Sequence, residues 1–105
     1  MQTVYLKKRA KNDLKRLFIR LMKYKKYPLT RQEAFEYVDL IEAKCFELNN
    51  TIIRRRTYSA DHIKFGKYVY RFDKHDHIQW FIIYDFDKYN NIAIKKIISN
   101  QSTKK

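Results

Sequence analysis

Hydrophobic and polar residues follow two different periods along the chain, and the change falls near residue 50. Before that point, apolar residues recur every three or four positions, which is the period of an amphipathic helix. One such run predicts a helix over residues 8–24, and a second predicts a helix over residues 30–48. The segment TVYL at residues 3–6 precedes both and is rich in strand-forming residues. The first half of the chain is therefore expected to form a strand followed by two helices.

Local signals mark the ends of these helices. Pro28 disfavours helical geometry at the residue before it, so the first helix is expected to end ahead of it. The sequence TRQE at residues 30–33 fits a capping box, in which the threonine and glutamate side chains each accept from the other's backbone N–H. Asn49 and Asn50 tolerate the left-handed conformation that often ends a helix. Because the connection between the helices is short, we expect an antiparallel helical hairpin.

Beyond residue 50 the pattern becomes alternating, which is typical of strands. The alternation begins weakly at residues 51–53, and three clearer runs follow at 68–72, 78–86 and 92–99. The middle run is apolar on both of its faces, so we expect it at the centre of a sheet that is covered on one side by the helices. Turns are expected at residues 74–76 and 90–91.

The last run shifts its apolar phase between Ile94 and Ile97, and a β-bulge near Lys95 and Lys96 would account for the shift. The first strand precedes the helices, so it is expected to join the sheet as an edge. The sequence thus predicts an α+β domain of the order β-α-α-β-β-β. In it, the helical hairpin packs on one face of a four-stranded, mainly antiparallel sheet.

Length and charge narrow the class of protein. At 105 residues the chain is the size of one small domain, which we expect over residues 1–100, followed by a basic tail at 101–105. The net charge is +13; residues 1–28 contribute +9 (ten basic, one acidic), 29–50 contribute −3 (two against five) and 51–105 contribute +7 (twelve against five). The positive electrostatic field of such a chain attracts nucleic acids, and it equally suits an acidic protein partner. No apolar run approaches the ~18 residues of a membrane span, so a cytoplasmic protein without a membrane partner is expected.

Three features have both a chemical and a structural interpretation. Cys45, the single cysteine, lies among helix-core positions, which favours burial over a catalytic thiol. The run His75-Asp76-His77 offers three metal ligands, but adjacent side chains in a tight turn diverge, so a polar turn is favoured and neither a metal nor another cofactor is expected. Trp80 and Phe86 are in phase with isoleucines, which favours core packing over stacking on exposed bases.

The order β-α-α-β-β-β in 105 residues resembles the RelE/ParE superfamily of type II toxin–antitoxin toxins. The segments that carry the resemblance are VYLKKRAKNDLKRLFIRL, FGKYVYRF, IQWFIIYDFD and IAIKKIISN. They cover nearly the whole chain and are similar to the family's first strand, its first helix with an alanine and a "DL" step, and its later strands. The resemblance implies a toxin that a cognate antitoxin neutralises, and an acidic antitoxin segment would suit the basic charge of this chain.

The resemblance also implies one of two targets. RelE-like members cut mRNA at the ribosome, using basic residues and often a tyrosine or histidine on the open face of the sheet, whereas ParE-like members inhibit DNA gyrase. RelE-like sequences often bear an arginine three residues before the tyrosine that aligns with Tyr84, and this chain has Phe81 there. Near the C-terminus, where an arginine and an aromatic or histidine are usual, it has Lys95, Lys96 and Asn100. A non-catalytic basic RNA-binding module is the alternative outside this family.

RNA cleavage that starts from the 2′-hydroxyl needs a group that takes its proton, cations near the phosphate, and a donor to the leaving oxygen. Arg71 is the first candidate because it alternates with Tyr70 and Phe72 and so lies on the other face of its strand. A solvated surface arginine is the competing interpretation. The catalytic candidates are Arg71, Lys67, His62 and Lys95, and the nucleic-acid-binding candidates are Arg54, Arg55, Arg56, Lys64 and Lys96.

Overall fold

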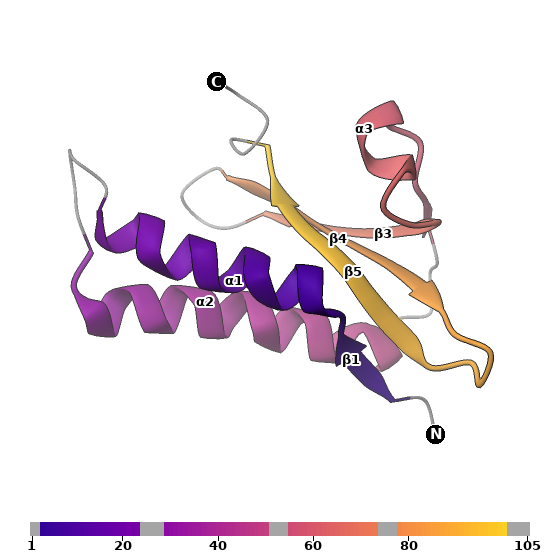
Figure 1. Ribbon diagram of the computed structural model, residues 1–105, viewed down its shortest axis with the longest axis horizontal. Coiled ribbons are helices and arrows are strands. Elements are labelled where there is room, and N and C mark those ends of the chain that lie inside the picture. Colours follow the sequence, from indigo (N-terminus) through magenta and orange to yellow (C-terminus); the bar gives the residue numbers. More distant parts are fainter. Residues whose placement is uncertain (1–2, 24–28, 51–54, 74–77, 101–105) are drawn as a thin grey trace.

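The computed structural model describes residues 3–23, 29–50, 55–73 and 78–100. These residues form a sheet with a pair of long helices on one face and a short helix on the other (Figure 1). The predicted α+β class and its order, a strand, two helices and then the remaining strands, are confirmed. The elements are β1 (Val4–Leu6), α1 (Lys8–Met22), α2 (Arg31–Phe46), a 3-10 helix η1 (Glu47–Asn50), β2 (Arg55–Arg56), α3 (Ala60–Ile63), β3 (Tyr68–Asp73), β4 (Gln79–Phe86) and β5 (Ile92–Ser99).

The strands form one sheet in the order β1-β5-β4-β3-β2. β1 lies at an edge, as expected, and pairs parallel with β5, whereas the other neighbours are antiparallel. The sheet has five strands rather than the expected four, because the two residues of β2 pair with Val69 and Tyr68 at the opposite edge. A two-residue strand is too short to show alternation, so the sequence pattern did not reveal it.

The predicted β-bulge lies in β5. Ile83 of β4 pairs with Lys96, but the next residue, Tyr84, pairs with Ile94, so Lys95 is the additional residue on β5. A bulge of this kind shifts the side-chain alternation by one position. It therefore places Ile94 and Ile97 in the same core cluster, although they are three residues apart.

The helical hairpin is built as the sequence predicts, except at the end of its second helix. α2 ends at Phe46 and continues as η1 to Asn50, and neither Asn49 nor Asn50 has a positive φ, so the expected left-handed helix end at these residues is wrong. The capping box is present: the hydroxyl of Thr30 accepts from the amide of Glu33 at 3.2 Å, and the Glu33 carboxylate accepts from the amide of Thr30 at 2.9 Å. α1 ends at Met22, and the predicted end at residue 24 lies outside the described residues. The helices cover one face of the sheet with a shared stripe of buried residues, which are Ala10, Leu14, Leu17, Ala34, Ile41 and Cys45.

The opposite face of the sheet, which we call the α3 face, has a second and smaller core. Val69, Ile83 and Ile98 are buried there, and Phe65 and Phe81 pack against them. β4 is therefore buried on both faces, as its pattern predicts. Trp80 packs on the helix side of β4 with 3% of its surface exposed, and Phe86 packs against the same cluster, so the structural interpretation of both aromatics is confirmed.

A loop between β2 and β3, which includes α3, lies over the α3 face. Gly66 brings this loop close to β4: a Cβ atom there would lie 3.0 Å from Cγ2 of Ile83 and 3.3 Å from the carbonyl oxygen of Tyr84. Thr57 fixes the other side of the loop, because its hydroxyl donates to the Gly66 carbonyl at 2.8 Å. The chain's only glycine thus lets the α3 segment pack directly on the sheet.

Candidate nucleic-acid interface

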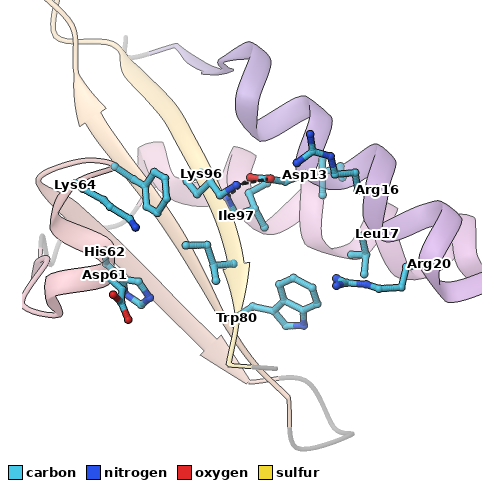
Figure 2. A pocket seen from close by; sticks show the side chains of 13 residues that line it. Asp13, Arg16, Leu17, Arg20, Asp61, His62, Lys64, Trp80, Lys96 and Ile97 are labelled. Carbon is cyan, nitrogen blue, oxygen red and sulfur yellow. Dashed lines mark hydrogen bonds and ion pairs between the residues drawn. The ribbon is translucent and has the colours of Figure 1, made fainter. Parts of the chain in front are cut away.

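A groove of about 580 Å³ runs between α1 and the α3 segment, past the C-terminal half of β5 (Figure 2). We call it the α1–α3 groove. α1 contributes Arg16 and Arg20, which lie on one side of the helix because they are four positions apart. The α3 segment contributes His62 and Lys64 from the other side, and Lys96 lies on β5 between the two walls. The groove thus joins three of the predicted site residues to two arginines from the distant first helix.

Asp13 of α1 ties the helix to β5 at the base of the groove. Its carboxylate accepts from Nζ of Lys96 at 2.8 Å and from the backbone amide of Ile97 at 3.0 Å (Figure 2). The pairing of β1 with β5 ends at Leu6 and Ile94, so this part of β5 pairs with β4 on one side and with no described strand on the other. The aspartate therefore satisfies an amide at the uncovered edge and neutralises Lys96 at the same time.

Besides the Lys96–Asp13 pair, the groove is lined by three cations, Arg16, Arg20 and Lys64, and by one further carboxylate, Asp61, so its charge is net positive. Within residues 3–23, 29–50, 55–73 and 78–100, the ion pairs are those of Lys96 with Asp13 and of Lys44 with Glu47. The three groove cations therefore have no acidic partner among the described residues. Side chains of this kind are available to bind an anion, and arginine offers paired donors that match a phosphate.

Phe65 lines the groove, and three cationic side chains lie close to its ring. The guanidinium of Arg9 lies 5.6 Å from the centroid of its ring, and the ammonium groups of Lys64 and Lys96 lie 5.2 and 5.3 Å from it. Each such cation–π contact contributes about 0.5–1 kcal/mol at an exposed site. The ring thus offsets part of the repulsion between three like charges that come from α1, the α3 segment and β5.

His62 has a ring that packs against Phe81, with 4.8 Å between the centroids. Partial burial lowers the pKa of His62 from its usual value, and the nearby charge of Asp61 opposes this effect. Desolvation disfavours the imidazolium, so the neutral ring is favoured near neutral pH. A neutral imidazole can accept a proton, which is the property that a general base requires.

Lys67 and Lys95 lie elsewhere on the molecule, in a hollow of about 390 Å³. Asp85 and Asp87 line the same hollow and hold its polar groups: Asp85 accepts from the Lys67 amide at 2.8 Å, and Asp87 accepts from the hydroxyl of Tyr5 at 3.0 Å. This hydrogen bond raises the pKa of Tyr5, so its hydroxyl remains protonated. The hollow therefore has mixed charge, and the two lysines predicted as catalytic are separated from His62.

Arg71 lies in neither of these hollows. It is exposed on β3 and pairs with Phe81, on the α3 face that the alternation predicts. Arg55 and Arg56 are exposed on the edge strand β2, where the guanidinium of Arg56 lies 5.6 Å from the centroid of Tyr68. Arg54 lies outside the described residues. The four catalytic candidates are thus divided among three places rather than joined in one.

Sequence reasoning missed Arg9, Arg16 and Arg20 as site residues. The basic face of the first helix is visible in the sequence, but nothing local indicates that this face approaches residues 62–64. The short α3 was also missed, since four residues show no helical period.

An apolar groove of about 930 Å³ lies on a different side of the molecule, along α1, α2 and β1. We call it the α1–α2 groove. Phe35 and Phe46 of α2 line it with 59% and 48% of their surface exposed. Its charged lining consists of three basic residues, Lys11, Lys15 and Arg31, and one acidic residue, Glu42. It is an amphipathic surface with an apolar centre and basic surroundings, which is the kind of surface that a protein partner covers.

Cys45 is fully buried, and burial raises the pKa of its thiol to about 12. The predicted role of this cysteine as a buried residue is confirmed. Among the described residues, no three His, Cys, Asp or Glu side chains are grouped so that they would hold a metal ion. The run His75-Asp76-His77 lies outside those residues.

Neither α1 nor α2, nor any other helix within the described ranges, is long and apolar enough to cross a membrane. No protein-family model, no curated protein and no solved structure matches the chain.

Proposed function

We propose that this protein is the toxin of a type II toxin–antitoxin system with a RelE/ParE-like fold, and that it acts on RNA at the α1–α3 groove. The observation that carries the proposal is the position of His62 and Lys64 across this groove from Arg16 and Arg20. The order of strands and helices supports it, since the helical hairpin that carries Arg16 and Arg20 covers one face of the sheet, the α3 segment lies over the other, and the two border one groove along β5.

The groove supplies each group that cleavage of RNA from its own 2′-hydroxyl requires. The neutral ring of His62 would take the proton of the hydroxyl, whose oxygen then bonds to the adjacent phosphorus while the bond to the 5′-oxygen breaks. Arg16 and Arg20 would bind the phosphate as its charge develops. Lys64 would donate to the leaving oxygen. The chemistry then needs only proton transfer and cations that are already in place.

The α1–α2 groove supports the second half of the proposal, which is neutralisation by an antitoxin. A partner that fits it presents an amphipathic helix, with apolar side chains for Phe35 and Phe46 and acidic ones for Lys11, Lys15 and Arg31. An acidic segment would also associate rapidly with a chain of charge +13. The toxin would act in the cytoplasm, where ribosomes and mRNA are found.

Inhibition without cleavage, of gyrase or by RNA binding alone, is the second candidate. It is favoured by the separation of Lys67, Lys95 and Arg71 from His62, and by Phe81 at the position where RelE-like sequences often carry arginine.

The test is induced expression in bacteria, with growth followed and the 5′ ends of cellular mRNA mapped. Wild type is expected to stop growth and to produce new 5′ ends in phase with codons. His62→Ala should remove these ends, whereas Arg71→Ala should retain them, since Arg71 does not line the groove. Circular dichroism of the purified variants controls for folding.

Three outcomes would argue against the proposal. Growth arrest without new 5′ ends but with loss of plasmid supercoiling would indicate gyrase as the target. Loss of cleavage in Arg71→Ala but not in His62→Ala would move the site to β3. Normal growth at high expression would contradict a toxin altogether.

A further inference from the structure

Trp80 has a polar atom without a partner beside the α1–α3 groove. Its indole Nε1–H is buried and makes no hydrogen bond to any described residue. Only 3% of the surface of Trp80 is exposed. An unpaired buried donor costs about 1–3 kcal/mol, so such donors usually have a partner in water or in a ligand. Trp80 lines the groove, and Figure 2 shows its ring projecting between β5 and α1, on the side of Arg20.

The walls of the groove near Trp80 combine apolar and cationic groups. Leu17 and Ile97 line this part and are buried, whereas the guanidinium groups of Arg16 and Arg20 lie along its α1 side (Figure 2). The volume of about 580 Å³ is within the range of roughly 300–1,000 Å³ typical of small-ligand sites. A flat apolar group with an oxygen acceptor and an attached phosphate would satisfy all of these features together.

We propose that the α1–α3 groove is a subsite for one unstacked nucleotide of single-stranded RNA. Arg16 and Arg20 bind its phosphate, and the base lies against Leu17 and Ile97. The indole of Trp80, whose Nε1 is buried in the free protein, turns toward the groove so that a base oxygen accepts from it. The inference rests on the proposed function in taking RNA as the ligand, but it concerns binding and not cleavage. It predicts a preference that charge alone does not give, because a base that is stacked and paired in a duplex cannot enter the groove.

Trp80 also provides the measurement, because it is the only tryptophan of the chain. A hexauridylate with 2′-O-methyl groups is the probe, since it lacks the free 2′-hydroxyl and so cannot be cut by the proposed route. Adding it should change the tryptophan fluorescence in a saturable way. An RNA duplex of the same number of phosphates should bind through the basic field but leave this fluorescence nearly unchanged.

The matched variants are Arg16→Gln/Arg20→Gln and Lys8→Gln/Lys23→Gln. Each removes two positive charges from exposed positions of α1 or its C-cap, but only the arginines line the groove. The arginine variant is expected to weaken hexauridylate binding on the order of tenfold, because paired donors to a phosphate are lost as well as charge. The lysine variant should weaken it by no more than about twofold, through the general field alone.

Equal weakening by the two variants would overturn the inference, because it would show binding by net charge without a site. Binding detected by anisotropy without a change in Trp80 fluorescence would place the RNA elsewhere. A stronger fluorescence response to a poly-glutamate peptide than to hexauridylate would make the groove a protein site. The proposed function fails separately: binding as described in a protein that neither arrests growth nor cuts RNA would leave the subsite in place and remove the toxin activity.

Discussion

Replacing Asp13 with alanine tests how α1 is held against the uncovered edge of β5. The substitution removes the 2.8 Å ion pair with Lys96 and leaves the amide of Ile97 without its 3.0 Å acceptor. The side chains of Asp13 and Lys96 are only 10% and 19% exposed, so water replaces these partners poorly. The same contact forms the base of the α1–α3 groove, which connects the stability of the fold with the geometry of the site.

The cost can be bracketed from these contacts. Hydrogen bonds to a charged group contribute about 1.5–3 kcal/mol, and breaking a buried ion pair costs about 3–5 kcal/mol. Because Lys96 retains some access to water and lies beside the Phe65 ring, its ammonium is not left fully without partners. We therefore expect Asp13→Ala to lower the free energy of unfolding by about 3 kcal/mol. Asp13→Asn keeps an acceptor for the Ile97 amide but loses the charge and the acceptor that faces Lys96, so its cost should lie below that of Asp13→Ala and above zero.

Urea unfolding of these variants measures the free energies, and a double-mutant cycle with Lys96→Met isolates the pair. Lys44→Ala is the control, because the Lys44–Glu47 pair is longer, at 3.8 Å, and its side chains are 36% and 59% exposed. An exposed pair of this kind contributes about 0–1 kcal/mol. A cost for Asp13→Ala no greater than that of Lys44→Ala would refute the reasoning.

Three further predictions concern the α3 loop and the core. Gly66→Ala should destabilise the fold by about 1 kcal/mol in urea unfolding. Overpacking against β4 costs about 1–3 kcal/mol, which exceeds the gain of about 0.4–1 kcal/mol from the lower entropy of the unfolded chain. An unchanged or higher stability would contradict the close approach of Gly66 to β4. Burial lowers the pKa of folded His62 below its usual 6.5, so on acidification the unfolded chain takes up this proton first. Wild type should therefore lose stability relative to His62→Gln as the pH falls from about 7 to about 5, and parallel stability profiles would refute that. Cys45, with a pKa of about 12, should react with a thiol reagent only when the protein unfolds, and rapid labelling of the native protein would show that the thiol is accessible.

The elements that carry a long periodic pattern could be predicted from the sequence. The two helices, the capping box at Thr30, the central strand β4 and the bulge at Lys95 all follow from local spacing. β2 and α3 could not be predicted, because elements of two and four residues are too short to show a period. They form only because the sheet edge and the apolar α3 face are already present to pair and pack with them.

The site was less predictable than the fold, because it depends on contacts between distant segments. His62, Lys64 and Lys96 were candidates by residue type, and the structure places all three along one groove. Arg16 and Arg20 join them because α1 packs against β5 through the core and through the hydrogen bonds of Asp13. Arg71 could be assigned to the correct face of the sheet from the alternation along its strand. The strand pattern alone could not show that Arg71 lies outside the α1–α3 groove.

The most direct test of the RNA-cleaving activity is a purified translation system in which ribosomes are stalled on a defined mRNA. The protein is added, and primer extension then locates any cut. Wild type is expected to cut the ribosome-bound mRNA, whereas His62→Ala, folded and still able to bind hexauridylate, is expected to leave it intact. Intact mRNA with active wild-type protein, or equal cutting by wild type and His62→Ala, would contradict the assignment of the α1–α3 groove as a ribonuclease site.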